Sequence, residues 1–139
     1  MINVTIWNEG RHEKESESVA KVYPKGIHSC IADFLGTDEE LNVTTATLDD
    51  EFNGLPDEVL ENTDVLLWWG HMAHDDVPNE LVEKIYNRVM RGMGFIALHS
   101  AHFSKPFRRL MGTTCSLKWR DGDRERFWCI NPSHPIAKG

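Results

Sequence analysis

Paired cysteines and long apolar runs are both missing from this chain of 139 residues. Its first residues lack a basic segment and reach Asn8 and Glu9 before any long apolar stretch, so we expect neither a signal peptide nor a membrane span. Cys30, Cys115 and Cys129 are odd in number, widely spaced and outside any CxxC pair, which argues against a disulfide framework and a zinc ribbon. We therefore expect a cytoplasmic protein with free thiols.

Positive charge is also scarce, because 15 basic residues stand against 22 acidic ones and give a net charge of -7. Such a chain repels phosphate backbones, so we expect no nucleic-acid partner and no membrane partner. The charge is uneven, since residues 1–104 carry 7 basic and 19 acidic side chains, whereas residues 105–139 carry 8 and 3. The basic tail predicts a solvated face or a surface that meets acidic protein, and anion binding is the second interpretation.

Repeats and low-complexity tracts are absent, and 40% hydrophobic content is enough for one buried core, so we expect a single domain over residues 1–139. Short β-rich runs alternate with helical patterns. The predicted strands lie at residues 4–7, 43–48, 64–69 and 95–98. The predicted helices lie at residues 18–22, 27–35, 57–62, 81–90 and 105–111. This alternation predicts an α/β fold whose parallel sheet binds ligands at the carboxyl ends of its strands.

Three finer predictions concern the ends of these elements. Asp76 is placed to cap the start of the helix at residues 81–90, and Gly92 to end it. Asp121-Gly122 is a strong turn sequence between β-prone runs, so a hairpin is predicted at residues 116–130. The chain then stops at residues 131–139 without a closing helix or strand, and we expect it to be the N-terminal part of a longer protein.

Histidines provide the sharpest indication of a site. Five of the seven directly follow predicted strands: His12, His71, His74, His99 and His102. A single histidine usually caps or donates a hydrogen bond, but five at one edge of a sheet predict a shared cleft.

Two chemistries fit these histidines. Catalytic zinc sites use three protein ligands and one open position, which His71, His74 and His102 would supply. The alternate ligands are Glu9, His12, Asp75 and Cys115. The two His-x-x-His pairs lack the glutamate of an HExxH motif, so the metal-free alternative remains open. In that alternative the imidazoles act as general acid and base near neutral pH, and Glu9 or Asp75 orients or shares the work.

Residues 97–101 have the small-x-X-x-small spacing of a nucleophile elbow, with His99 at the centre. Ser100 is the nearest hydroxyl and a conceivable nucleophile, although capping the next helix is its simpler role. Trp7, Trp68 and Trp69 lie at or near strand ends, and burial in the core is expected for at least two of them. Trp69 is the best candidate for stacking on a sugar ring.

Several motifs together resemble one known family. They are NEGRHE at residues 8–13, YPKGIH at 23–28, WWGHMAHD at 68–75, LHSAHFSK at 98–105 and MGTTCSLKWR at 111–120. In these motifs the chain resembles the trehalose utilisation, or ThuA-like, family. The resemblance implies a class I glutamine amidotransferase-like fold, which is a flavodoxin-like three-layer α/β/α arrangement with a mostly parallel sheet. It also implies a link to the catabolism of trehalose or a related disaccharide.

The strand-end and motif residues together give the expected site. We expect catalytic roles for His99, Ser100, Glu9, His12 and Asp75, and sugar contacts from Trp69, His28, Lys105 and Cys115. Glutaminases of this fold need a cysteine at the elbow, and residues 97–101 contain none, so glutamine hydrolysis is not expected.

Two functions stay open. The first is a hydrolase, isomerase or lyase that acts on trehalose or a keto derivative through histidine proton transfer or a divalent metal such as zinc. The second is a non-catalytic protein that binds a sugar or a partner on the same scaffold. A small-molecule sugar is the expected partner, and a homo-oligomer is the default assembly.

Overall fold

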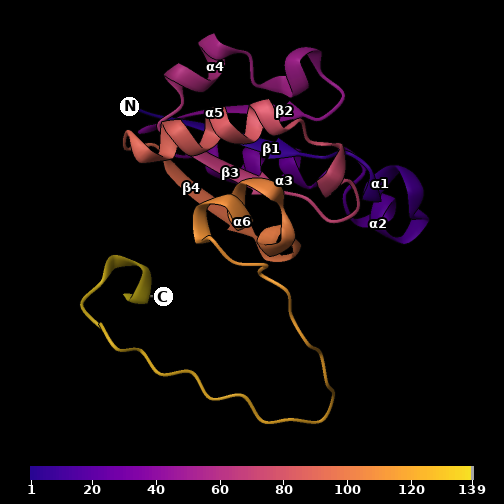
Figure 1. Ribbon diagram of the computed structural model, residues 1–139, viewed down its shortest axis with the longest axis vertical. Helices are drawn as coiled ribbons and strands as arrows, with labels where there is room; N and C mark the ends of the chain where they lie inside the picture. Colours follow the sequence, from indigo (N-terminus) through magenta and orange to yellow (C-terminus); the bar gives the residue numbers. More distant parts are fainter. Residues whose placement is uncertain (139) are drawn as a thin grey trace.

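A computed structural model describes residues 1–138 and places its strands in one parallel sheet. The strands are β1 (Ile2–Asn8), β2 (Leu41–Thr47), β3 (Val65–Trp69) and β4 (Gly94–Leu98). Their order across the sheet is β2-β1-β3-β4, and all neighbouring pairs are parallel (Figure 1). All four predicted strands are therefore confirmed, with boundaries that differ by a few residues.

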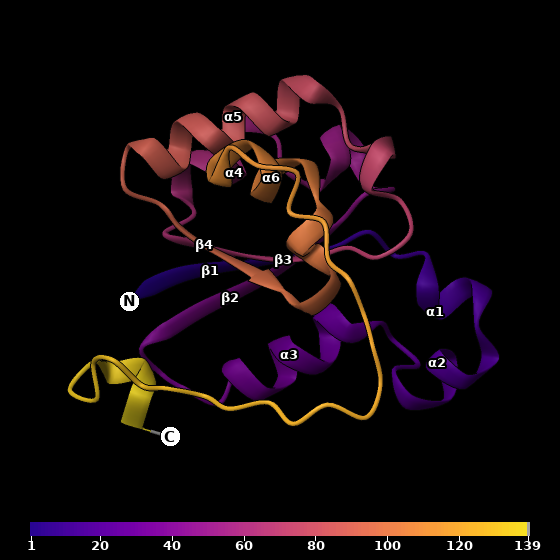
Figure 2. The same cartoon turned by 60° about the horizontal axis from the view of Figure 1, so that its bottom comes forward.

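Helices cover both faces of this sheet. The α-helices are α1 (His12–Glu15), α2 (Glu17–Val22), α3 (Ile27–Leu35), α4 (Asp57–Asn62), α5 (Asn79–Met90) and α6 (Lys105–Met111). Short 3-10 turns are η1 (Glu51–Gly54), η2 (His74–Asp76), η3 (His99–Phe103) and η4 (Pro135–Lys138). Figure 2 shows α3 on one face and α4, α5 and α6 on the other. The predicted flavodoxin-like α/β/α arrangement is confirmed.

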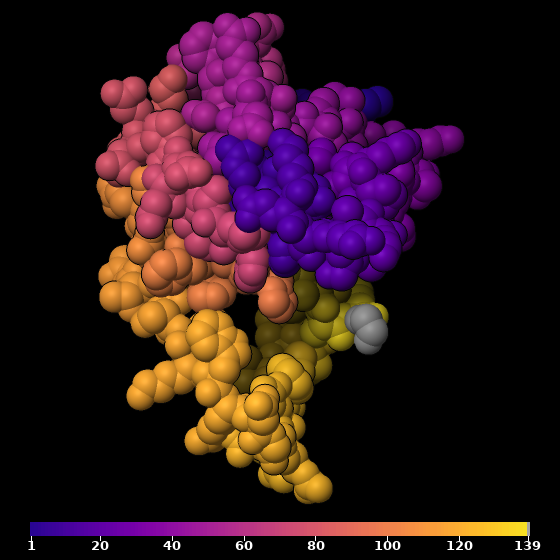
Figure 3. All heavy atoms as spheres, turned by 90° about the vertical axis from the view of Figure 1, so that its right-hand side faces the viewer, coloured from indigo at the N-terminus to yellow at the C-terminus, as the bar shows by residue number. Residues whose placement is uncertain are grey.

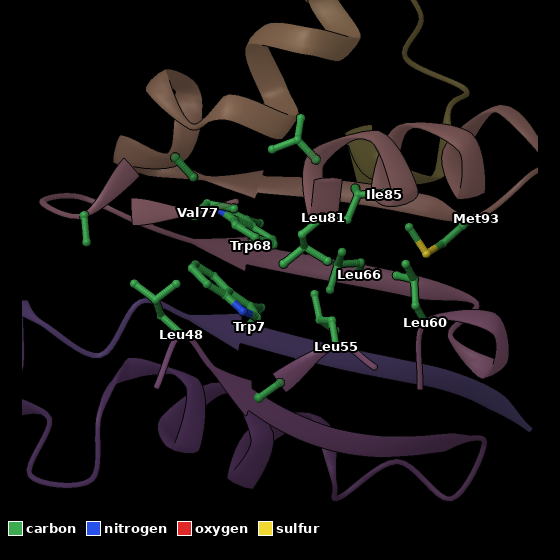
Figure 4. Packing of buried hydrophobic residues seen from close by; sticks show 14 residues of the cluster. Trp7, Leu48, Leu55, Leu60, Leu66, Trp68, Val77, Leu81, Ile85 and Met93 are labelled. Atoms are coloured by element: carbon green, nitrogen blue, oxygen red, sulfur yellow. The ribbon is translucent and has the colours of Figure 1, made fainter. Parts of the chain in front are cut away.

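Alternation along β1 divides the core between the two faces, because successive strand residues point to opposite sides. Val4 and Ile6 pack with Leu67 on the α3 face. Trp7 points to the opposite face, where it stacks on Trp68 with ring centroids 3.7 Å apart (Figure 4). Both tryptophans are buried, as expected, and belong to the core rather than to a binding surface.

The register of the sheet brings the strand ends to one level. Asn8 pairs with Trp69, and Trp69 pairs with Leu98. The residues that follow β1, β3 and β4 therefore leave the sheet side by side along one edge.

The predicted hairpin is wrong. Residues 112–134 contain no strand, and most of this segment extends away from the body of the molecule (Figures 1 and 3). Gly122 does adopt a turn conformation with a φ of 81°, but Phe127, Trp128 and Ile130 are all exposed. The physical reason is that an isolated two-stranded hairpin is marginal unless its apolar side chains pack on a sheet or helix, and Phe127, Trp128 and Ile130 pack on neither.

The predicted Asp76 cap is also wrong. Pro78 occupies the N-cap position of α5 and no side chain caps that end, while Asp76 lies two residues upstream in the turn η2. Gly92 follows the C-cap Arg91, and its N–H bonds to the carbonyl oxygen of Val89, so the predicted end of this helix is confirmed.

Among residues 1–138, none of the helices has the length and apolar character needed to cross a membrane.

Candidate active site

A pocket of about 680 Å³ opens at the carboxyl ends of β3 and β4. Its sheet side is lined by His71, His74, His99, Ser100 and His102. Its other side is lined by Phe103, Ser116, Leu117 and Trp119. Four of the five strand-end histidines thus share one cavity, which is where a parallel α/β sheet is expected to bind its ligands.

His102 is held in a defined orientation. Its Nδ1 lies 2.8 Å from the carbonyl oxygen of Cys115. A carbonyl only accepts hydrogen bonds, so Nδ1 carries the proton, and in the neutral ring Nε2 keeps a lone pair. That lone pair can accept a proton or a hydrogen bond from a ligand.

His74 is less well satisfied. Its Nδ1 is buried and has no hydrogen-bond partner. Burial lowers the pKa of this imidazole, and the positive charge of Arg108 acts in the same direction, against the carboxylate of Glu9. Since the ordinary histidine pKa is already about 6.5, His74 is neutral at pH 7 and able to accept a proton.

His99 and Ser100 form the turn that leaves β4. His99 has a φ of 45°, a left-handed conformation that is unusual for a residue with a side chain and is often found at functional sites. Its ring stacks on Trp69, with centroids 6.3 Å apart. Ser100 Oγ is buried without a partner, so this residue does not cap the next helix. Ser104 caps α6 instead, by accepting a hydrogen bond from the Phe107 amide at 3.4 Å.

Two buried side-chain atoms stand out across residues 1–138 because they lack hydrogen-bond partners: His74 Nδ1 and Ser100 Oγ. Both belong to residues that line the histidine pocket. Buried polar groups are nearly always paired, because each unpaired one costs about 1–3 kcal/mol. Both unpaired atoms thus belong to neighbouring lining residues of one cavity, and unpaired buried groups of this kind are often found at functional sites.

Glu9 lies behind the pocket rather than in its lining. Only 1% of this residue is exposed. Its carboxylate accepts hydrogen bonds from the backbone amides of Met72, at 2.7 Å, and Ala73, at 2.9 Å. The carboxylate therefore anchors the loop that carries His71 and His74. This anchoring from a distance of more than 60 residues in sequence could not be foreseen from the residue type alone.

The remaining predicted residues are spread around this edge. The ring of His12 stacks on that of His71 with centroids 4.7 Å apart. Asp75 has a side chain that is 92% exposed and lies outside the pocket lining. Cys115 contributes its backbone carbonyl, which orients His102, rather than its thiol.

His28 lies elsewhere, in the first turn of α3. The side-chain amide of Asn8 donates to Glu13 Oε1, at 2.6 Å, and to His28 Nδ1, at 2.8 Å. Because Asn8 Oδ1 accepts from the Gly10 amide, the donor role of its Nδ2 is fixed. His28 Nδ1 must then accept, and burial lowers the pKa of this imidazole, although the nearby Glu13 carboxylate opposes the shift. The structure places His28 in a packing network and outside the lining of the histidine pocket.

A family comparison agrees with the motifs and the fold. The model of the protein family described as trehalose utilisation matches residues 3–139, which is nearly the whole chain. The chain belongs to the trehalose utilisation (ThuA) family. Membership supports a role in trehalose utilisation. A comparison with curated proteins found no match.

The predicted metal ligands of this ThuA-family chain do not form a ligand set. Over the part of the chain that the structure describes, no three His, Cys, Asp or Glu side chains are grouped so that they could hold a metal ion. His71, His74 and His102 line the same pocket, and the bond of His102 Nδ1 to a carbonyl leaves Nε2 as the free nitrogen of that ring.

Sequence reasoning missed the apolar wall of the pocket. Phe103 contacts the rings of His74 and His102 edge-on, with centroid distances of 5.9 and 6.1 Å. Trp119 approaches His102 at 6.5 Å. Phe103 lies inside the LHSAHFSK motif, so its neighbours in sequence could have indicated it. Trp119 was assigned to a hairpin strand, which hid its position beside the pocket.

Proposed function

We propose that this chain is an enzyme of disaccharide catabolism that binds trehalose or a keto derivative of it in the histidine pocket and moves protons with its imidazoles. The observation that carries the proposal is a cavity lined by four histidines, two of whose lining residues, His74 and Ser100, have a buried polar atom without a hydrogen-bond partner. A sugar offers hydroxyl groups that both donate and accept hydrogen bonds, so it can satisfy both atoms.

In this proposal the residues in and behind the pocket have different roles. His102, whose Nδ1 proton is bonded to the Cys115 carbonyl, accepts a proton from a sugar hydroxyl at Nε2. His74 is neutral at pH 7 and provides a second acceptor. Phe103 and Trp119 supply apolar faces on which a sugar ring can stack, as aromatic side chains commonly do. Glu9 holds the loop that presents His71 and His74.

Turnover tests this proposal directly. The substrates are trehalose and its keto derivative, and the variants are His102→Gln and His74→Gln. The matched control is His134→Gln, because His134 is an exposed histidine outside the pocket. Removal of a general acid or base commonly lowers kcat by about 100- to 10,000-fold. We expect losses of that size in the first two variants and none in the control.

The same samples separate the remaining alternatives. A divalent metal such as zinc would require His71, His74 and His102 to turn toward one point, and metal analysis of the purified protein tests it. Stoichiometric metal that is lost in His71→Ala and His102→Ala would favour a metal-assisted enzyme. Sugar binding without turnover by the wild-type protein would instead identify a non-catalytic binding protein and contradict the proposed enzyme.

A further inference from the structure

A second hollow adjoins the histidine pocket. It is more open, has a volume of about 1030 Å³ and lies over α6 and the start of the C-terminal tail. Phe103 and Ser116 line both cavities, so the two lie next to each other. The lining of the second hollow includes Lys105, Arg108 and Arg109, with hydroxyl groups from Thr113, Thr114 and Ser116.

One of these three cations is already neutralised. Arg109 donates to both carboxylate oxygens of Glu83, at 2.7 and 3.2 Å, and its guanidinium lies 3.7 Å from the ring centroid of Tyr86. This pair lowers the pKa of Glu83, as expected for a carboxylate held by two hydrogen bonds from a guanidinium. Arg109 and Glu83 together leave no charge for a ligand.

The other two cations keep their charge. Lys105 Nζ donates to the backbone carbonyl oxygens of Asp75, at 2.8 Å, and Val77, at 2.7 Å, which are neutral groups. The Arg108 guanidinium lies over the Phe103 ring, 4.5 Å from its centroid. The Arg108 ion pair with Asp75 spans 3.9 Å and involves a side chain that is 92% exposed, so water screens it strongly. The hollow therefore holds nearly two unbalanced positive charges in a chain whose net charge is -7.

Phe103 connects this charge to the histidines. The Phe103 ring contacts the rings of His74 and His102, and it also contacts the Arg108 guanidinium. All three groups lie within 6.1 Å of the Phe103 ring centroid. A ligand that lies against the histidines can therefore reach the guanidinium by extending past a single aromatic ring.

We propose that the second hollow is an oxyanion subsite that binds the phosphate group of a phosphorylated sugar whose ring occupies the histidine pocket. A guanidinium matches two phosphate oxygens with its fork of N–H donors, and the hydroxyls of Thr113, Thr114 and Ser116 can donate to the remaining ones. The ring's location rests on the proposed function. The phosphate's location rests only on Arg108, Lys105 and the shape of the hollow.

Calorimetric titration of the protein with four probes tests this subsite: trehalose, trehalose phosphate, inorganic phosphate and a sugar carboxylate. Arg108→Met removes the charge and keeps an apolar side chain on Phe103. Arg108→Lys keeps the charge but loses the forked pair of N–H donors of the guanidinium. Arg91→Met is the matched control, because Arg91 is an exposed arginine that pairs with Glu61 at the far end of α5. We expect the wild-type protein to bind trehalose phosphate at least roughly tenfold more tightly than trehalose, since charge-assisted hydrogen bonds are worth about 1.5–3 kcal/mol. Arg108→Met should abolish this advantage, Arg108→Lys should retain part of it, and Arg91→Met should keep it.

The outcomes distinguish this inference from the proposed function. Equal affinities for trehalose and its phosphate in the wild-type protein would overturn the subsite and leave the proposed function standing. Phosphate binding that depends on Arg108, without any affinity for trehalose, would support the subsite and count against the proposed function. A sugar carboxylate that binds as tightly as the sugar phosphate, again through Arg108, would support the oxyanion subsite and show that a carboxylate can supply the oxyanion. Equal losses in Arg108→Met and Arg91→Met, or no binding of any probe, would overturn the subsite.

Discussion

Glu9→Gln is the substitution that most sharply tests how the pocket is held together. The glutamate side chain is buried and accepts two backbone hydrogen bonds, from Met72 and Ala73. A glutamine of the same shape keeps one acceptor oxygen but turns an NH₂ group toward the second amide, so two donors face each other. The loss of one charge-assisted hydrogen bond costs about 2 kcal/mol.

The expected result has a global and a local part. Urea unfolding should show a free energy of unfolding lower by about 2 kcal/mol, and the amides of Met72 and Ala73 should exchange with solvent roughly thirtyfold faster. Glu17→Gln is the matched control, because the Glu17 side chain is 85% exposed and pairs only with Lys21 on the surface. If Glu9→Gln and Glu17→Gln give the same stability and the same amide exchange, Glu9 does not anchor the histidine loop and the reasoning fails.

Three further predictions follow from single contacts. Ser104→Ala removes the N-cap of α6 and should lower the free energy of unfolding by about 1 kcal/mol in urea, whereas Ser18→Ala, at an exposed serine, should leave it unchanged. The pKa of His28 is lowered in the folded state, so between that value and about 6.5 the unfolded chain binds more protons and the fold loses stability as the pH falls. The free energy of unfolding should fall less between pH 7.5 and pH 5.5 in His28→Gln than in the wild-type protein, because this range spans the ordinary histidine pKa of about 6.5. An unchanged fall would contradict the lowered pKa of His28. Trp119→Ala should weaken sugar binding roughly tenfold in calorimetry, because stacking of this kind is worth about 1 kcal/mol or more, while Trp128→Ala, in the exposed tail, should not.

Much of the fold was predictable from the sequence, because strand and helix patterns here agree with the tertiary structure. The apolar run at residues 64–69 can only be a buried strand, and its parallel partners bring the strand ends to one edge. That edge is enough to predict a histidine cleft. The prediction of a hairpin at residues 116–130 was wrong. The local turn preference is real, but nothing in the sequence shows that most of the apolar side chains lack a surface to pack on.

Site details depended on contacts between distant residues and were harder to predict. The sequence indicates that Glu9 and His28 are near strand or helix ends, but not that one anchors a loop and the other packs against Asn8. Arg108 belongs to a basic helix whose three cations look equivalent in sequence. Only the pairing of Arg109 with Glu83 separates them.

The central claim is that the histidine pocket receives a sugar. Titration of the protein with trehalose, followed by the imidazole C–H resonances of its seven histidines, tests this most directly. We predict saturable shifts at His71, His74, His99 and His102, with His28 and His134 unmoved as internal controls, and a midpoint at a roughly tenfold higher trehalose concentration in Trp119→Ala. Shifts confined to His28 or His134, or no saturable shift with either trehalose or its keto derivative, would contradict the account.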